Sequence, residues 1–289
     1  MATETHTLPA QKPERLTDGL SGFERFAVAS ITALNHNPVT KYLSYLFTRY
    51  VSQRWILLVV GRRLQVTGGE HVAKLPSDAR ILIVANHRTL WDLYVALSVW
   101  LTLNDRAWRM YFPVKRTFFY THPVGWLVNL GISAGGMWPP MSPTLDRRGR
   151  TAAGLAELSR LLSEPSTIVG IHPEGTRNKS PDPLNFLNAK GGVGRLVKEC
   201  DPDVLVLPFY MDGLSDSLKL EFQRGFSAPG PGREPPLRLV YGEPFRAGDL
   251  DRESSPKEIA RDLLGRVHAL GSSLPPAQRD ATAWPATKT

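Results

Sequence analysis

The pattern of hydrophobic and polar positions divides the chain into a helical pair and a longer region where strands and helices alternate. Between residues 22 and 60, apolar and aromatic residues recur at helical spacing and are interrupted at Pro38, which predicts two helices joined near that proline. From residue 62 onward, short apolar runs that end in polar turns alternate with helix-compatible segments. This alternation predicts an α/β fold with one mixed, mainly parallel sheet flanked by helices. We expect a flexible leader at 1–20, an amphipathic helical hairpin at 21–61, an α/β domain at 62–270 and a disordered tail at 271–289.

Individual strands follow from short apolar or alternating runs bounded by turn residues. The predicted strands lie at 63–68, 81–85, 107–114, 166–171, 204–210, 218–223 and 237–242. Residues 135–143 contain paired glycines and three prolines, so a loop is expected there. Leucines at helical spacing predict a helix over 152–162. Another helix should begin after Ser255, because Pro256 and Glu258 complete a capping box, and should end near Leu270.

The predicted helical pair has an unusual composition for a simple core element. It is rich in Tyr, Leu, Phe and Trp, and basic residues flank this surface at Lys41, Arg49, Arg54, Arg62 and Arg63. Two helices of this composition suit either a membrane interface or a surface of their own domain, and the aromatic density together with the arginines favours the membrane. No uninterrupted apolar run reaches the ~18–20 residues of a spanning helix. We therefore expect a peripheral, monotopic protein on the cytoplasmic face of an anionic membrane.

The charge balance narrows the class of partner, and the cysteine count narrows the chemistry. With 35 Lys+Arg against 27 Asp+Glu and a pI near 9.7, the chain favours anionic partners such as phosphorylated metabolites, anionic lipids or nucleic acid. An aromatic RNA-binding motif and a recognition helix are both missing from the sequence, so nucleic acid is not an expected partner. The single Cys200 excludes an intrachain disulfide, and the seven histidines lack metal-binding spacing, so no metal site is expected.

The first concentration of chemistry follows the apolar run at 81–85. The run gives way abruptly to Asn86 and His87, and Asp92 stands five positions after the histidine. Residues five apart on one helix point about 140° away from each other, so a contact requires His87 in the turn and Asp92 in the first helical turn. The carboxylate would then hold one ring nitrogen and leave the other as a general base for a substrate hydroxyl. Alternatively, His87 only ends a strand and Asp92 only favours a helix start.

A second polar turn follows the predicted strand at 166–171. It carries His172, Glu174, Gly175, Thr176 and Arg177. Basic residues between the two turns are Lys115, Arg116, Arg147 and Arg148. If the two strands are parallel neighbours, their carboxyl ends share one crevice and the polar turns meet. An acid–base pair beside guanidinium groups suits an acceptor that carries both a hydroxyl and a phosphate.

The two turns, taken together and in this order, resemble the signature motifs of the glycerolipid acyltransferase family. The Asn-His-x4-Asp element occupies 86–92, and Pro-Glu-Gly-Thr-Arg occupies 173–177. Residues 115–131 resemble the second block of the family and residues 206–209 its fourth, so the likeness extends over roughly 22–241. Within the family, the pattern is similar to that of 1-acylglycerol-phosphate (lysophosphatidic acid) acyltransferases.

The resemblance implies a direct acyl transfer. His87 would deprotonate the acceptor hydroxyl, which then attacks the thioester of an acyl-CoA or acyl-carrier protein, while Asp92 orients His87. No covalent acyl-enzyme is implied, so Cys200 need not act as a nucleophile, and no cofactor is expected beyond the acyl donor. The implied substrate-binding residues are Glu174, Gly175, Thr176, Arg177, Lys115, Arg147 and Arg148. The implied partners are a lysolipid acceptor, the donor and an anionic membrane surface.

Departures from the family pattern leave the acceptor open. Thr89 stands where serine is common, His172 where an aromatic such as Phe is usual, and Asn178 where serine is common. After Gly131, where the family often has an acceptor-binding arginine, the chain inserts GGMWPPMSP, and Arg147 and Arg148 are the nearest candidates. A lyso-ornithine lipid, another lysolipid or a specialised-metabolite hydroxyl or amine is therefore an alternative acceptor. The rival functions are a non-catalytic anionic-lipid-binding module and a thioester hydrolase.

Overall fold

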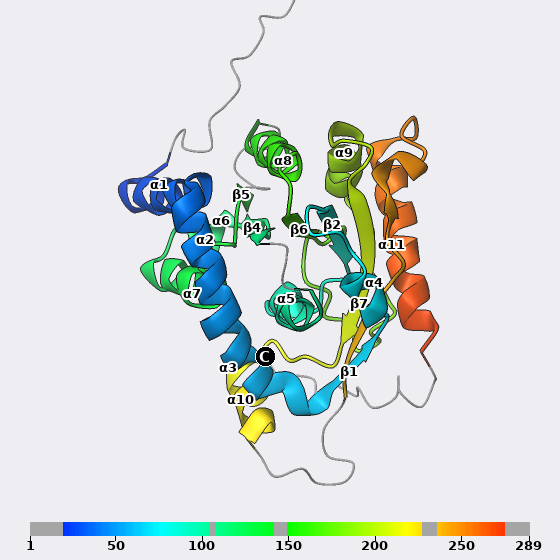
Figure 1. Ribbon diagram of the computed structural model, residues 1–289, viewed down its shortest axis with the longest axis horizontal. Helices are drawn as coiled ribbons and strands as arrows, with labels where there is room; N and C mark the ends of the chain where they lie inside the picture. The colour runs from blue at the N-terminus through cyan, green and yellow to red at the C-terminus, as the bar shows by residue number, and fades with distance from the viewer. Residues whose placement is uncertain (1–19, 105–107, 142–148, 227–235, 275–289) are drawn as a thin grey trace, which may run out of the picture.

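A seven-stranded mixed sheet forms the centre of the protein, with helices on both faces (Figure 1). The computed structural model describes residues 20–104, 108–141, 149–226 and 236–274. Most of the predicted leader and tail, residues 1–19 and 275–289, lie outside this part of the chain. The strands are β1 (Leu64–Thr67), β2 (Arg80–Ala85), β3 (Arg109–Tyr111), β6 (Thr167–Ile171), β7 (Leu205–Asp212), β8 (Leu237–Tyr241) and β9 (Phe245–Arg246).

The strand order confirms the predicted fold class. The sheet runs β1-β8-β7-β2-β6-β3, and β9 pairs with β7 beside this path. All pairs are parallel except β7 with β8 and β7 with β9. The central strand β2 pairs with both β6 and β7, with Ile81 opposite Ile168 and Leu205. It is buried on both faces, which explains why its sequence is a continuous apolar run rather than an alternating one.

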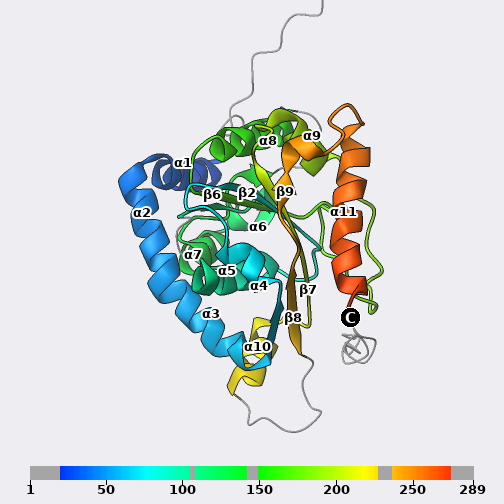
Figure 2. The same ribbon diagram turned by 45° about the vertical axis from the view of Figure 1, so that its right-hand side comes forward.

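The helices cover the two faces of this sheet unequally. The helix α5 (Asp92–Leu103) packs on one face, while α8 (Gly149–Leu162), α9 (Gly192–Glu199) and α11 (Pro256–Ser272) cover the other (Figures 1 and 2). The predicted capping box of α11 is present, since Ser255 N–H donates to Glu258 Oε2 over 2.9 Å. The short helix α4 (Gly69–Ala73) lies between β1 and β2.

The N-terminal segment forms the predicted pair of helices. It comprises α1 (Gly22–His36), α2 (Pro38–Phe47), a π-helical turn (Thr48–Ser52), α3 (Gln53–Val60) and a 3₁₀ turn (Gly61–Arg63). The junction falls at Asn37, whose side chain accepts a hydrogen bond from Val39 N–H over 2.9 Å and so caps α2. The helices α2 and α3 make one long rod that meets α1 at a corner (Figures 1 and 2). None of the helices in the described ranges is long and apolar enough to cross a bilayer.

The prediction of a strand at 218–223 is wrong, because helix α10 (Leu218–Phe226) occupies these residues. Leu218, Leu220 and Phe222 alternate with polar residues as in a half-buried strand. The helix instead buries Glu221, which forms an ion pair with Arg63 and accepts the Ser215 amide over 2.8 Å. It also stacks Phe222 on Trp55 of α3, with ring centroids 6.2 Å apart. These tertiary contacts outweigh the local alternation.

The region between β3 and α8 holds a small second sheet. Strand β4 (Val114–Lys115) pairs in parallel with β5 (Pro140–Met141), which lies inside the predicted loop at 135–143. Helices α6 (Arg116–Phe119) and α7 (Pro123–Ser133) connect the two strands. Residues 142–148, which include the candidate acceptor residues Arg147 and Arg148, lie outside the described residues.

Candidate active site

The two predicted polar turns lie side by side because their strands are parallel neighbours. Strands β2 and β6 are in register up to Val84 opposite Ile171. Their carboxyl ends therefore open on the same edge of the sheet, where α/β proteins bind ligands. The turns are joined through the backbone of His87, whose N–H donates to Glu174 Oε2 over 2.7 Å and whose carbonyl accepts Asn178 N–H over 2.7 Å.

The contact between His87 and Asp92 is present. His87 lies in the turn, Asp92 is the first residue of α5, and the distance from His87 Nδ1 to Asp92 Oδ2 is 3.2 Å. The imidazole side chain is 21% exposed, whereas the carboxylate is 2% exposed. Nδ1 is the ring nitrogen that contacts the carboxylate, so Nε2 is the one that Asp92 leaves free for another partner.

Asp92 is held by four hydrogen bonds. Besides the His87 ring, Arg88 N–H donates to Oδ2 over 2.6 Å, and Thr89 N–H donates to the same oxygen over 2.9 Å. The Thr89 hydroxyl donates to Oδ1 over 2.6 Å. Burial raises the pKa of Asp92, but the hydrogen bonds from His87 and Thr89 and the two neighbouring histidines outweigh it, so the pKa lies below its ordinary value. The carboxylate is therefore ionised at neutral pH.

The backbone amides of the turn at 87–91 are all engaged by side chains. Their acceptors are Glu174 for His87, Asp92 for Arg88 and Thr89, Asp216 for Leu90 at 3.3 Å, and the Thr89 hydroxyl for Trp91 at 3.1 Å. The turn is therefore firmly held. Because these amides already donate, an oxyanion at this site needs other donors.

A second histidine lies against the first. The rings of His87 and His172 are stacked with centroids 3.9 Å apart and an interplanar angle of 7°. His172 Nδ1 lies 3.1 Å from the Ala85 carbonyl oxygen at the end of β2, so this nitrogen carries the proton. Burial, followed by the charge of His87, lowers the pKa of His172 to about 3. The His172 ring is therefore neutral at physiological pH.

Glu174 is buried, and both of its carboxylate oxygens accept backbone amides. It is 1% exposed, and its second oxygen accepts Leu187 N–H over 2.8 Å. Burial raises its pKa, and the hydrogen bonds from the Leu187 and His87 amides partly offset this. The next residue, Gly175, has a φ of +65°, and a Cβ there would lie 3.1 Å from Lys190 Cγ, so both conformation and space favour glycine.

Three further predicted substrate-binding residues are exposed at or beside the second turn, namely Lys115 of β4, Thr176 and Arg177. Arg177 forms an ion pair with Asp216 over 2.8 Å, and the two side chains are 43% and 34% exposed. Lys115 donates to the Thr176 hydroxyl over 3.3 Å. The sequence analysis did not identify Asp216 as a site residue. It follows the carboxyl end of β7, the other parallel neighbour of β2, so the same strand-end argument applies to it.

An apolar pocket lies next to the turn at 87–91. It is open to solvent and lies between α3, α5 and α10. The lining residues are Trp55, Ile56, Val59, Val60, Trp91, Tyr94, Val95, Leu214, Leu218 and Glu221. Trp91 directly precedes Asp92 in the chain, so the pocket adjoins the turn that carries the histidine–carboxylate pair.

The three side chains at the centre of the site resemble a metal-binding cluster only in composition. One potential ligand atom each from His87, Asp92 and His172 lies within 4.8 Å of the others. The two rings are nearly parallel, so their in-plane lone pairs do not converge on one ion. The oxygens of Asp92 already accept four hydrogen bonds. The arrangement therefore suits proton transfer better than metal coordination.

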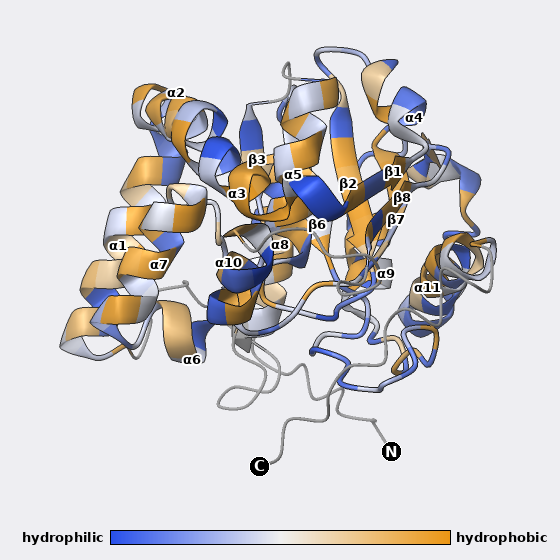
Figure 3. Ribbon diagram, turned by 90° about the horizontal axis from the view of Figure 1, so that it is seen from below, coloured by the Kyte–Doolittle hydropathy of each residue, from blue (hydrophilic) through white to orange (hydrophobic). Residues whose placement is uncertain are grey.

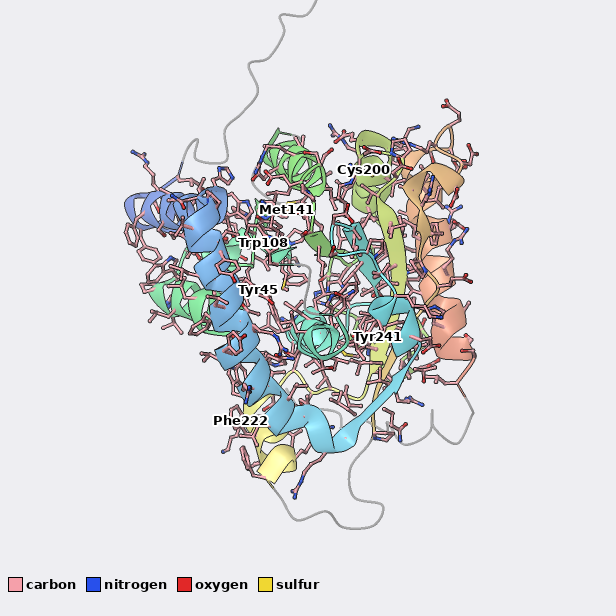
Figure 4. The ribbon with its side chains drawn as sticks, in the orientation of Figure 1. Tyr45, Trp108, Met141, Cys200, Phe222 and Tyr241 are labelled. Atoms are coloured by element: carbon pink, nitrogen blue, oxygen red, sulfur yellow. The ribbon has the colours of Figure 1, made fainter. Side chains whose placement is uncertain are left out.

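Cys200 lies at the amino ends of the central strands, opposite the ends that carry the candidate site. It follows α9, and the adjacent Asp201 pairs with Arg80 at the start of β2, whereas the histidine–carboxylate pair follows the end of that strand. Figure 4 shows Cys200 beside α9. The thiol is 4% exposed, and burial raises its pKa to about 11. It is therefore remote from His87 and protonated at neutral pH.

The site thus combines a histidine in contact with a buried carboxylate and exposed cations at the carboxyl ends of parallel strands of an α/β sheet. The chain belongs to the acyltransferase family, since the model of that family matches residues 63–212, more than half of its length. The protein is therefore an acyltransferase. Among solved structures, it is similar to the 1-acyl-sn-glycerophosphate (LPA) acyltransferase PlsC from Thermotoga maritima, with 17% identity and a TM-score of 0.48. That match covers 86% of this chain and 88% of the other.

Proposed function

We propose that the protein moves a fatty acyl group from an acyl-CoA or acyl-carrier-protein thioester to the hydroxyl of a lysophospholipid-type acceptor. His87 is the general base, and Asp92 orients it. The observation that carries this proposal is the contact of His87 Nδ1 with the ionised Asp92 carboxylate, which leaves Nε2 for the acceptor. Family membership supplies the reaction class.

In the proposed reaction, His87 Nε2 takes the proton of the acceptor hydroxyl as its oxygen attacks the thioester carbonyl carbon. The carbon–sulfur bond of the tetrahedral intermediate then breaks, and the leaving thiolate takes the proton from the His87 imidazolium. The products are an ester and a free thiol, and the imidazole is restored. Asp92 stabilises the transient imidazolium, because its carboxylate is buried and already ionised.

Exposed cations near His87 support an acceptor with a phosphate. Lys115 and Arg177 lie on the solvent side of the second turn, and both side chains suit phosphate oxygens. The ion pair of Arg177 with Asp216 also favours a second candidate acceptor. A carboxylate beside the acceptor site suits a lysolipid or specialised metabolite that carries an amine instead of a phosphatidate head group.

The apolar pocket between α3, α5 and α10 is the proposed place of the acyl chain. Its lining is almost entirely apolar, and it begins at Trp91, next to the reacting groups. An extended hydrocarbon chain gains free energy when it leaves water for such a surface.

We propose that the N-terminal helices hold the enzyme on an anionic membrane as a peripheral protein of the cytoplasmic face. The helices α1, α2, α3, α7 and α10 lie along one side of the molecule (Figures 1 to 3). The support is a set of exposed apolar side chains on these helices and on the π-helical turn between α2 and α3. They are Phe26, Val39, Tyr42, Leu43, Phe47, Tyr50, Val51, Leu58, Val124, Leu127, Phe222 and Phe226. Exposed Arg54 and Arg62 flank this apolar face. Such a combination is typical of a surface that inserts into a lipid interface.

A donor and acceptor panel tests the reaction. The purified enzyme is assayed with acyl-CoA and acyl-carrier-protein donors against several lysolipids, and the product mass is measured. His87→Ala is expected to abolish acyl transfer, whereas His71→Ala, a partly exposed histidine on α4, should leave it unchanged. Near-full activity of a folded His87→Ala variant contradicts the proposed base. Release of free acid without dependence on an acceptor indicates a hydrolase, and saturable lipid binding without thioester consumption indicates a binding module.

Vesicle co-sedimentation tests the membrane surface. Replacing Leu43 and Tyr50, which are 57% and 61% exposed, with serine should weaken binding to anionic vesicles by on the order of tenfold. Val66→Ser, a 42% exposed position on strand β1, is the matched control and should bind like the unaltered protein. Equal binding of all three proteins contradicts the proposed surface.

A further inference from the structure

The ring of His87 is contacted on two sides. Asp92 meets its edge through Nδ1 at 3.2 Å, and His172 covers one face at a centroid distance of 3.9 Å. An edge contact through one hydrogen bond fixes the position of one nitrogen but allows the ring to rock about that point. A second flat ring, parallel within 7°, restricts this motion because a tilted His87 ring would enter the contact distance of His172.

The neighbouring strands hold His172 in place. His172 directly follows β6, and the last register pair of that strand with β2 is Val84 with Ile171. The ring of His172 is then anchored through Nδ1 to the Ala85 carbonyl, two residues before His87. The His172 ring is therefore hydrogen-bonded to the end of β2, the strand that His87 follows. This bond fixes the position of one ring relative to the other.

We propose that His172 is a positioning residue for acyl transfer: its ring face holds the plane of the His87 imidazole so that Nε2 stays directed at the acceptor hydroxyl, and His172 itself exchanges no proton. This inference rests on the proposed role of His87 as the base. In this role the ring face of His172 positions His87, and the Nδ1 hydrogen bond anchors His172 itself. Different substitutions remove these two functions separately.

The protonation state of His172 agrees with this role. Burial and the nearby charge of His87 lower the pKa of His172 to about 3, so it offers a neutral ring throughout the working pH range. His87 becomes an imidazolium during the reaction, and a second positive charge at 3.9 Å would oppose that step. A neutral aromatic face tolerates the cation.

Two variants of the full-length enzyme separate the ring face from the hydrogen bond. His172→Phe keeps a flat ring without a donor for Ala85, whereas His172→Asn keeps an amide donor at the position of Nδ1 without a ring. We expect His172→Phe to retain kcat within about threefold of the unaltered enzyme. We expect His172→Asn to lose roughly 10- to 100-fold in kcat with unchanged KM for donor and acceptor, because small misplacements of a reacting group have effects of this size.

Circular dichroism and thermal unfolding establish that each variant is folded, and His87→Ala is assayed alongside. A folded His172→Asn variant with the kcat of the unaltered enzyme overturns the inference, and so does a folded His172→Phe variant as inactive as His172→Asn. If His172→Asn does not fold, the activity of His172→Phe alone decides, since a retained kcat supports the ring face and a lost kcat refutes it. Retained activity in His87→Ala, by contrast, refutes the proposed function and not the positioning role.

Discussion

Replacing Asp92 with asparagine tests the centre of the site with the least disturbance of the fold. The asparagine carbonyl can take the place of Oδ2, where the His87 ring and the Arg88 and Thr89 amides converge. The amide group then faces the Thr89 hydroxyl, which can accept as well as donate. The change therefore removes the negative charge and keeps the shape and most hydrogen bonds of the turn.

The expected effects differ sharply between stability and rate. Hydrogen bonds to a charged group contribute about 1.5–3 kcal/mol and neutral ones about 0.5–1.5 kcal/mol, but the amide also avoids the cost of burying a charge. We expect Asp92→Asn to destabilise the fold by about 1–3 kcal/mol. Without the carboxylate, the imidazolium is not stabilised, and losses of about 10³- to 10⁴-fold in kcat are expected from comparable triads. Asp92→Ala would leave two backbone amides and a hydroxyl without acceptors, at about 1–3 kcal/mol each, and is a poorer test.

The assay combines chemical denaturation with steady-state acyl transfer. Asp262→Asn, a 51% exposed carboxylate paired with Arg266, is the matched control and should change neither quantity measurably. Because the pKa of Asp92 lies below its ordinary value of 3.8, the ionised carboxylate stabilises the fold above about pH 4, and this contribution declines as the pH falls through the folded-state pKa. A folded Asp92→Asn enzyme with kcat within tenfold of the original would refute the proposed role of Asp92.

Three further predictions concern groups around the site and the core. Glu174→Gln should destabilise the fold by about 1–3 kcal/mol, because the glutamine NH₂ group would face one of the two backbone N–H groups that now donate to the carboxylate. An unchanged free energy of unfolding in chemical denaturation would contradict this. Burial, followed by the charge of Arg109, lowers the pKa of Lys41 to about 7, so the folded state binds fewer protons than the unfolded state above that pH. The free energy of unfolding of the unaltered protein should accordingly rise by about 2 kcal/mol from pH 7 to 9 relative to that of Lys41→Met. A difference between the two proteins that stays the same over this pH range would refute the prediction. Leu218→Trp at the apolar pocket should shift the preferred donor to shorter acyl chains, whereas Leu127→Trp on α7 should not; identical chain preferences would exclude this pocket as the acyl site.

Most of the fold was predictable because its elements have strong local patterns. The continuous apolar runs of β2, β6 and β7 mark strands buried on both faces, and the capping box at Ser255 marks the start of α11. The failure at 218–223 has a physical cause. Its alternation is compatible with a strand, but in the helix Glu221 forms a buried ion pair with Arg63 and Phe222 stacks on Trp55.

The candidate site was predictable in its residues and only partly in their contacts. The spacing of His87 and Asp92 predicted their contact, since both lie in one local turn. The roles of these residues and of Lys115, Thr176 and Arg177 stay predictions. The expectation that Glu174 shapes the acceptor site also stays a prediction. Its two contacts with backbone amides could not be inferred before the position of residue 187 was known.

The sequence by itself determined the elements and the residues able to perform the chemistry, because propensity, capping and motif spacing act within about one turn of the chain. Only the tertiary structure decided which of those residues meet. The parallel pairing of β2 with β6 brings His172 onto His87, and the end of β7 brings Asp216 to Arg177. Such contacts depend on strand order and register, which result from the packing of the whole core rather than from any local pattern.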